Sequence, residues 1–260
     1  MNRLNKLFEN NPQDVLSIYF TAGFPNLNDT LSIAEELEKN GVELIEIGMP
    51  FSDPLADGPV IQESSTIAIK NGMTIPVLFE QLKELRKSVS IPVVLMGYLN
   101  PIMQFGFEKF LMACKTCGID GLIIPDLTLD EINEQYDALF KKHHLSNISL
   151  VTPQTSNERI KLIERLSNGF VYFVSSSSIT GSSIEKNKEQ LEYFEKIKNL
   201  KINNAKLIGF GISNHQTFST ACKYANGAIV GTAFINALKK ETPIKEFIQQ
   251  IKFNHDYTTI

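Results

Sequence analysis

The sequence has few cysteines, no excess of positive charge and no long hydrophobic run, and each of these absences excludes a class of protein. Three cysteines, Cys114, Cys117 and Cys222, are too few for a disulfide framework and fit a reducing cytosol. The formal net charge of -4 gives no electrostatic basis for binding nucleic acid or an anionic membrane. No apolar run is long enough to span a bilayer, and the first residues lack the apolar core of a secretory signal. We therefore expect a cytoplasmic protein.

Candidate metal ligands are also scarce. Cys114 and Cys117 have metal-ligand spacing, but no second Cys or His pair lies at a usable distance along the chain. His143 and His144 fall at the end of an expected helix, where a positive charge favours the helix dipole. Only His215, at the start of a helix, is near an expected strand end. We therefore predict no metal site and no Ser/His or Cys/His nucleophile.

Short apolar segments alternate with longer helical patterns along the chain, and no low-complexity linker or charge block divides it. A short helix is expected at 2–9. The apolar segments predict eight strands, at 17–22, 44–48, 92–97, 121–124, 148–151, 170–174, 206–209 and 227–230. The helical patterns lie at 28–39, 60–70, 76–88, 107–117, 129–143, 158–166, 189–198, 215–224, 233–238 and 244–251.

Eight strand–helix units predict an α/β fold of the (β/α)8 TIM-barrel type, as a single domain over residues 1–260. It would carry an extra N-terminal helix and an extra short helix after the eighth strand. A doubly wound open sheet is the alternative, and it more often has a glycine-rich dinucleotide turn after its first strand. Gly23-Phe24-Pro25 stands at that position and is no such turn, which favours the barrel.

The chain is organised around residues 44–59, LIEIGMPFSDPLADGP. Glu46 is a carboxylate in an apolar strand, where an unpaired charge is costly, and a buried ion pair is one interpretation of it. The prolines of the following loop stiffen a segment that holds Asp53 and Asp57, although an exposed acidic loop is possible. Barrel active sites lie at the C-terminal ends of the strands. Glu46 and Asp57 are therefore candidates for paired acid–base chemistry at that end.

Two glycine segments predict an anion site at the same end of the barrel. They are 209–213, after the seventh strand, and 231–233, after the eighth. Barrels often bind phosphate with these two loops and a helix N-terminus, and glycine lets backbone N–H groups approach the anion. Neither segment contains Lys or Arg, so binding would rest on backbone N–H groups and the Thr232 hydroxyl. Tight βα turns are the alternative explanation of the glycines.

The loop at 175–183, after the sixth strand, is small and polar. It is either a flexible surface loop or a lid in which Thr180 and Gly181 order over a substrate, and the residues alone leave both open.

Residues 46–59 closely resemble the signature of the tryptophan synthase α subunit family, and the resemblance continues at 118–127, 180–181 and 209–213. It covers nearly the whole chain. The resemblance implies a (β/α)8 barrel that cleaves indole-3-glycerol phosphate to indole and glyceraldehyde 3-phosphate by a retro-aldol reaction. It implies no metal or organic cofactor. It also implies a β subunit as partner, in a heterotetramer of two α and two β subunits, which receives indole through a tunnel.

The resemblance also implies roles for particular residues. Glu46 matches the acid that protonates indole C3 and relays protons, Asp57 matches the carboxylate that engages the indole N–H, and Asp53 matches a position at the α–β contact. The remaining matches are substrate-binding positions around the phosphate or the indole and glycerol groups: Tyr19, Met96, Tyr98, Ile123, Tyr172, Thr180, Gly181, Phe210, Gly211, Gly231 and Thr232.

The sequence departs from the family pattern in two places. Residues 176–179 replace a stretch that commonly contains Arg and Gly, which concerns lid closure and coupling to a partner more than the chemistry. Thr232 stands where Ser is usual. Three other functions remain open: a stand-alone indole-3-glycerol phosphate lyase, a degenerate subunit that only activates β, and another phosphate-binding barrel such as a sugar-phosphate isomerase. Intact Glu46 and Asp57 argue against the second, and the 46–59 motif argues against the third.

Overall fold

The computed structural model describes residues 2–10, 12–54, 56–175, 184–209 and 211–253. Within these residues a sheet of parallel strands has the order β5-β4-β3-β2-β1-β9-β8-β7-β6. The strands are β1 (Val15–Thr21), β2 (Leu44–Gly48), β3 (Val93–Met96), β4 (Gly121–Ile123), β5 (Ser146–Ile148), β6 (Leu150–Val151), β7 (Phe170–Val174), β8 (Ala205–Gly209) and β9 (Gly227–Val230).

β5 and β6 are two parts of one barrel strand, separated at Ser149. β5 pairs with β4, β6 pairs with β7, and the Tyr172 N–H donates to the Ser149 carbonyl at 3.1 Å. The sheet therefore forms a ring of eight strand positions, which confirms the expected barrel fold. The expected strand at 148–151 is wrong in its start and continuity. Pairing begins at Ser146, opposite Gly121 on β4, because the neighbouring strand fixes the register there.

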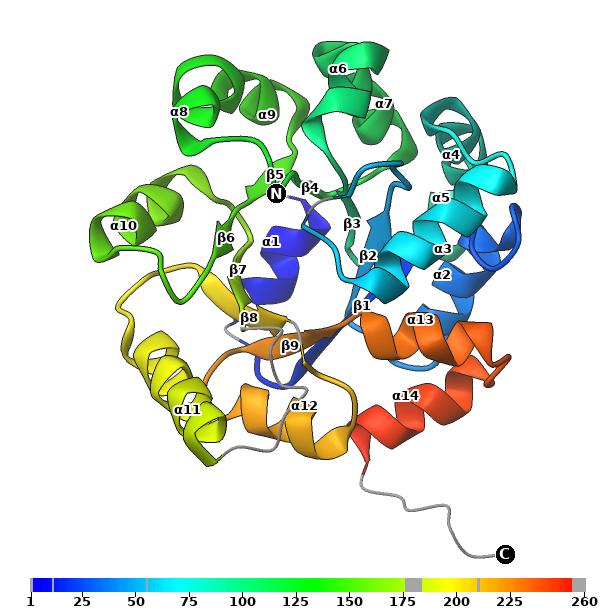
Figure 1. The fold of residues 1–260 in the computed structure, drawn as a ribbon. Helices are drawn as coiled ribbons and strands as arrows, with labels where there is room; N and C mark the ends of the chain where they lie inside the picture. Colours follow the sequence, from blue (N-terminus) through cyan, green and yellow to red (C-terminus); the bar gives the residue numbers. More distant parts are fainter. Residues whose placement is uncertain (1, 11, 55, 176–183, 210, 254–260) are drawn as a thin grey trace, which may run out of the picture.

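Helices surround the strands on the outside of the ring, except the first helix of the chain, which lies within the ring in the view of Figure 1. They are α1 (Arg3–Phe8), α2 (Asp29–Lys39), α3 (Pro59–Lys70), α4 (Ile75–Leu82), α5 (Leu85–Ser88), α6 (Leu99–Phe105), α7 (Phe107–Cys117), α8 (Leu129–Glu131), the π-helix η1 (Ile132–Tyr136), α9 (Asp137–His143), α10 (Asn157–Leu166), α11 (Ile184–Asn199), α12 (His215–Cys222), α13 (Thr232–Lys239) and α14 (Ile244–Lys252). The predicted extra helices are present: α1 precedes the barrel, and both α13 and α14 follow the last strand.

α6 is a helix that the sequence analysis did not predict. It contains Pro101, which resembles a helix breaker in the sequence. Pro101 stands in the first turn of α6, where a backbone N–H has no partner within the helix and its loss costs little. The helix therefore begins directly after β3, close to the C-terminal end of the barrel.

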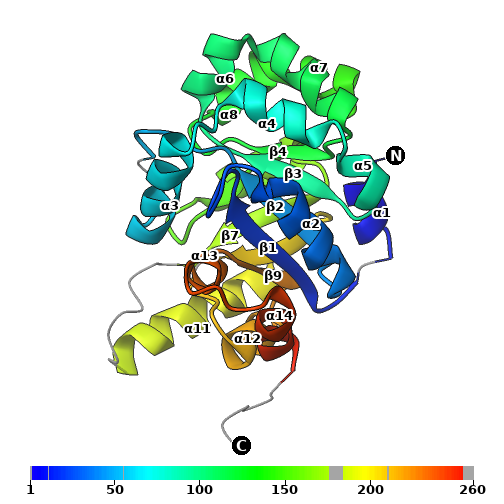
Figure 2. The ribbon, with the colours of Figure 1, turned by 90° about the vertical axis from the view of Figure 1, so that its right-hand side faces the viewer.

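α1 lies at the N-terminal end of the barrel, away from the predicted site (Figure 2). A buried charge network ties it to that end. The Asp120 carboxylate accepts the Arg3 backbone N–H at 3.0 Å, Arg86 Nη2 at 2.7 Å and the Val93 N–H at 3.0 Å. Arg86 also donates to the Gly118 carbonyl at 2.9 Å through Nε. A buried charge is tolerated only when it is paired and hydrogen-bonded, and Asp120 meets both conditions. The network leaves the opposite end of the barrel free to hold a ligand.

Candidate active site

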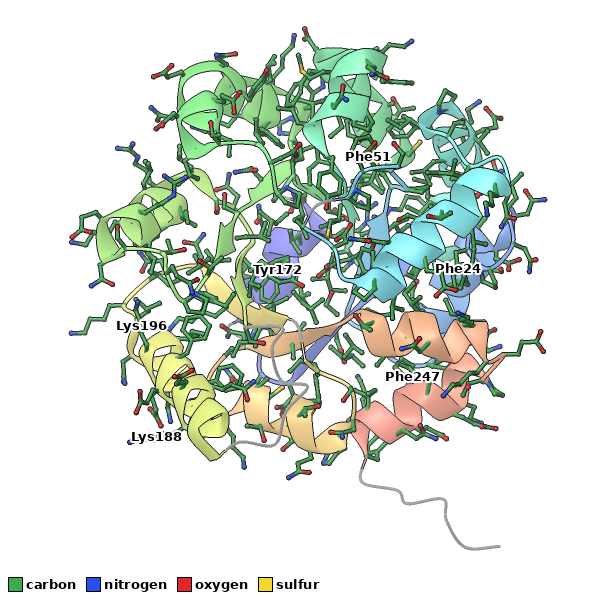
Figure 3. The ribbon with its side chains drawn as sticks, in the orientation of Figure 1. Phe24, Phe51, Tyr172, Lys188, Lys196 and Phe247 are labelled. Carbon is green, nitrogen blue, oxygen red and sulfur yellow. The ribbon has the colours of Figure 1, made fainter. Side chains whose placement is uncertain are left out.

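A pocket lies at the C-terminal ends of the strands, at the centre of the ring. It contains about 450 Å³ of empty space, part of it open to solvent. Figure 3 shows the Tyr172 side chain near the middle of the ring. The lining residues come from four strands, from the loops after β2, β8 and β9, and from two helices: Tyr19, Asp57, Ile61, Met96, Tyr172, Gly211, Ile212, Ile229, Gly231 and Thr232. Residues predicted from three separate parts of the sequence therefore meet in one pocket.

Glu46 is fully buried in β2, beside Tyr19 of β1 and next to the pocket rather than in its lining. Its Oε1 accepts a hydrogen bond from the Ser17 hydroxyl at 2.8 Å. Its Oε2 is buried and has no hydrogen-bond partner among the described residues. Among the described residues, Glu46 has this hydroxyl and no cation as its partner, so the ion-pair interpretation is wrong there. Burial raises the pKa of Glu46 to about 8, although the Ser17 hydrogen bond opposes the shift.

Asp57 lies across the pocket, in the loop between β2 and α3. The Tyr98 hydroxyl donates to Asp57 Oδ2 at 3.2 Å, and it accepts the Ala56 N–H at 3.0 Å. The Asp57 N–H donates to the Pro54 carbonyl at 3.1 Å, so the carboxylate stands on a tight turn. Burial raises the pKa of Asp57 to about 6, and the Tyr98 hydrogen bond opposes this. Near neutral pH, Glu46 therefore favours the acid form and Asp57 the anion.

Two tyrosines of the pocket rest on glycines of the neighbouring strands. A Cβ atom at Gly48 would lie 2.1 Å from the Tyr19 hydroxyl oxygen, and one at Gly209 would lie 2.2 Å from the Tyr172 hydroxyl oxygen. Any side chain at either glycine would therefore collide with the ring. Burial raises the pKa of both tyrosines above the ordinary value, so both rings present neutral hydroxyls.

The opposite side of the pocket has the features of an anion site. Gly211 has φ +74°, a conformation that glycine adopts without strain. Gly231 precedes the first turn of α13 and forms no side-chain cap, so the first N–H groups of that helix point toward the pocket end without a capping side chain. Thr232, the first residue of α13, lines the pocket with its neighbour Gly231. Helix N-termini and glycine loops of this kind bind phosphate through backbone N–H groups.

Asp53 lies outside this pocket, in a second cleft on the outer side of the same loop. The cleft is lined by Phe51, Asp53, Ala56, Tyr98, Pro125 and Asp126. The Asp53 carboxylate is exposed and accepts a hydrogen bond from the Ser52 hydroxyl. Tyr98 borders this second cleft and also donates a hydrogen bond to Asp57, so one side chain contacts both the pocket and the cleft.

The structure does not bring every predicted residue to the pocket. Ile123 is fully buried in β4 and is not among the lining residues. The predictions for Thr180, Gly181 and Phe210, and for the departure at 176–179, lie outside the described residues.

Sequence reasoning missed four residues of this region: Ile61, Ile212 and Ile229, which line the pocket, and Ser17 behind it. Strand alternation places Ser17 on the same face as Tyr19, and this pattern could have indicated that Ser17 lies near the pocket.

The described part of the chain contains no candidate metal site. No group of three or more His, Cys, Asp or Glu side chains is arranged there to hold a metal ion. Cys114 and Cys117 lie in the last turn of α7, as expected, and Cys117 Sγ donates to the Phe79 carbonyl at 3.6 Å. Among the residues described, no helix is long and apolar enough to cross a membrane.

The fold and the pocket define a class: a (β/α)8 barrel whose pocket, at the C-terminal ends of its strands, is lined by Asp57 and by glycines of the last two strand–helix loops. The comparisons with known proteins narrow the class to one family. A model of the tryptophan synthase alpha chain matches residues 5–258, and the chain belongs to this family. Its members are lyases of tryptophan biosynthesis that cleave indole-3-glycerol phosphate, and they normally pair with a beta subunit.

Individual relatives agree with the family model. The tryptophan synthase alpha chain of Flavobacterium johnsoniae is 54% identical over 254 residues, which are 97% of this chain and 100% of the relative. The crystal structure of tryptophan synthase subunit alpha from Legionella pneumophila is 32% identical, with a TM-score of 0.84, and 97% of each chain is covered. A crystal structure of tryptophan synthase from M. tuberculosis is 27% identical, with a TM-score of 0.84, and covers 97% of this chain and 98% of that chain.

Proposed function

We propose that this chain cleaves indole-3-glycerol phosphate to indole and glyceraldehyde 3-phosphate in the pocket described above, with Glu46 and Asp57 as its catalytic residues. The observation that carries the proposal is that two carboxyls lie at one pocket, and that near neutral pH Glu46 favours the protonated form and Asp57 the ionised form. Their pKa values are raised to about 8 for Glu46 and about 6 for Asp57. The reaction takes place in the cytoplasm and needs no metal or organic cofactor.

The two carboxyls divide the chemistry. Glu46, buried beside Tyr19 and next to the pocket, gives a proton to C3 of the indole ring. The positive charge that develops on the ring nitrogen is stabilised by the Asp57 carboxylate. The hydroxyl on the carbon next to the ring then gives its proton to the Glu46 carboxylate. The carbon–carbon bond breaks, its electrons return to the ring, and the hydroxyl carbon becomes the aldehyde.

Substrate recognition uses both ends of the pocket. The phosphate binds at Gly211, Gly231 and Thr232, where backbone N–H groups and one hydroxyl replace the usual cation. Gly181 joins this group by the family resemblance. Tyr19, Met96 and Tyr172 surround the apolar ring. By the same resemblance, Tyr98, Ile123, Thr180 and Phe210 contribute to substrate binding.

The chain works in a heterotetramer of two alpha and two beta subunits and passes indole to the beta subunit. Asp53 is the contact residue of this chain. Its exposed position in the second cleft, beside Tyr98 and within the loop that carries Asp57, supports this role. A partner bound at this cleft would act on the same loop as the substrate.

The deciding experiment is the release of indole from indole-3-glycerol phosphate, measured with and without a tryptophan synthase beta subunit. Release that beta accelerates supports the proposal. No release in either condition, from a folded protein with an intact Glu46, refutes it. A stand-alone lyase is the second candidate, because the sequence at 176–179 departs from the family pattern. High turnover that beta does not change would favour it.

A further inference from the structure

Ser17 and Glu46 form a buried contact that the proposed chemistry has not used. Neither side chain has surface exposed to solvent, and the Ser17 hydroxyl lies 2.8 Å from Glu46 Oε1. The two residues stand on adjacent strands, paired in the register Ser17↔Leu44 and Tyr19↔Glu46. The sheet therefore fixes their separation, and the contact does not depend on a mobile loop. Ser17 precedes Tyr19 by two residues on the same face of β1, so it lies deeper in the barrel than the pocket.

The two oxygens of the Glu46 carboxyl have different surroundings. Oε1 accepts the Ser17 hydrogen bond, whereas Oε2 is buried without a hydrogen-bond partner among the described residues. A neutral carboxyl group has one oxygen that carries the proton and one that only accepts. Because Oε1 is engaged by the Ser17 hydroxyl, Oε2 is the oxygen that is left without a partner and can exchange a proton.

We propose that Ser17 is a positioning residue that assigns the two oxygens of Glu46 different roles: Oε1 is the acceptor of the Ser17 hydroxyl, and Oε2 is the oxygen that exchanges the proton with the substrate. The inference rests on the acid–base role proposed for Glu46. The proton on Oε2 passes to indole C3, and the proton of the hydroxyl that becomes the aldehyde returns to the carboxyl. Glu46 therefore ends the reaction in the form in which it began.

The contact also sets the pH range in which the acid is available. A hydroxyl that donates to a carboxylate stabilises the charged form, so it lowers the pKa of Glu46 against the larger effect of burial. The other titratable groups around the carboxyl are Tyr19 on β1 and Tyr172 on β7, with Asp57 in the same pocket. On the other side of β2, β3 places the apolar Val94 opposite Glu46. Removal of the Ser17 hydroxyl leaves all of these groups in place.

Ser17→Thr and Ser17→Val are a matched pair, because the two new side chains have the same shape and only Thr keeps a hydroxyl. The rate of indole release by the full chain is measured against pH for both variants and for wild type. The alkaline limb of kcat should move to higher pH by about 0.5–1 unit in Ser17→Val, and much less in Ser17→Thr. KM should be nearly unchanged in both, because Ser17 does not line the pocket. Ser17→Ala, which is smaller than the native residue, gives the same comparison if Ser17→Val does not fold.

A second readout follows the carboxyl itself in the protein without substrate. With 13C-labelled glutamate, the infrared C=O band that Glu46→Gln removes belongs to Glu46 and can be titrated. A titration that moves upward in Ser17→Val and not in Ser17→Thr, together with the kcat limb, supports the proposal. An identical titration in the two variants overturns the role of Ser17, whatever the rates. If the infrared titration moves and the alkaline limb of kcat does not, the effect of Ser17 on Glu46 stands. The proposed role of Glu46 as the acid of the reaction is then overturned instead.

Discussion

Tyr98 holds Asp57 through a single hydroxyl: it donates to Asp57 Oδ2 at 3.2 Å and accepts the Ala56 N–H at 3.0 Å. The hydroxyl therefore fixes both the carboxylate and the backbone on which it stands. Tyr98 also borders the second cleft that contains Asp53. The position of the Asp57 carboxylate and the shape of the second cleft thus depend on the same side chain, and this relationship suggests the first test.

Tyr98→Phe should lower kcat by about tenfold, because Asp57 loses a donor to its charged form and the Ala56 N–H loses its acceptor. The loss should be greater near pH 6 than at pH 8, since the hydrogen bond holds the pKa of Asp57 down. Steady-state rates across that pH range test this. Tyr193→Phe is the matched control, because the Tyr193 hydroxyl donates to the Val151 carbonyl away from Asp57. Equal effects of the two variants would contradict the prediction.

Glu46→Gln should reduce indole release by roughly 10²–10⁴-fold with the fold intact, because the amide keeps the shape of the side chain and cannot relay a proton. Circular dichroism and the binding of glycerol phosphate serve as controls for folding and for the pocket. Turnover close to wild type would remove Glu46 from the mechanism.

The anion site should depend on its glycines. Gly211→Val and Gly231→Val should weaken the binding of glycerol phosphate. Gly211 has a positive φ, and a Cβ at Gly231 would already be in contact with the Tyr19 ring at 3.4 Å, so the methyl groups of Val would crowd the site. Thr232→Ala should lose one hydrogen bond of about 0.5–1.5 kcal/mol, and Thr232→Ser should retain it. Calorimetric titration with glycerol phosphate measures all four variants. Unchanged affinity in both glycine variants would place the phosphate elsewhere.

Asp53→Ala should abolish most of the stimulation by the beta subunit and change the rate of the lone chain much less, because Asp53 is exposed on the outer side of the loop. The quantity to measure is the ratio of indole release with beta to release without it. Glu195→Ala, at an exposed acidic position on α11, is the control. Equal losses with and without beta would place Asp53 in the catalytic pocket instead of at an interface.

Stability should fall as pH rises through the range in which Glu46 titrates. Its folded-state pKa of about 8 lies above the ordinary value of 4.5, so the folded state binds the proton more tightly. The free energy of unfolding should therefore decrease between about pH 4.5 and 8, by at most about 1.4 kcal/mol per pH unit from this group. Asp57, raised to about 6, contributes in the same direction at lower pH.

Urea denaturation of wild type and Glu46→Gln at pH 5 and pH 8.5 tests the sign. The variant should gain stability relative to wild type at the higher pH, because it has no carboxyl to ionise. A difference that does not change with pH would show that Glu46 titrates alike in the folded and unfolded states.

The sequence predicts the barrel and the pocket well where a local sequence pattern determines the structure. Alternation along β2 is enough to separate Glu46 from Ile45 and Ile47, and the loop sequence is enough to bring Asp57 to the strand ends. The prediction from sequence fails where pairing with a neighbouring strand determines the bounds of an element. β5 begins at Ser146 because β4 lies beside it, and the polar Ser146 and Asn147 give no strand signal of their own.

Contacts between distant segments were equally beyond the sequence. The Ser17–Glu46 hydrogen bond depends on the β1–β2 register, which sets how deep each side chain lies in the barrel. The double contact of Tyr98 depends on where the β2–α3 loop folds over β3. In both cases the residue type is visible in the sequence, and its partner is determined by the packing of strands that are far apart along the chain.

The two tyrosine–glycine contacts restrict how this pocket can evolve. Because a Cβ at Gly48 or Gly209 would overlap the Tyr19 or Tyr172 hydroxyl, a larger residue at either glycine is compatible only with a smaller or displaced aromatic partner. A larger residue at either glycine must therefore follow or accompany a change at its tyrosine, because a replacement at the glycine alone is poorly packed. Engineering the barrel for a bulkier ring should start from the tyrosines, since shortening them opens space without a collision, whereas the glycines offer no first step.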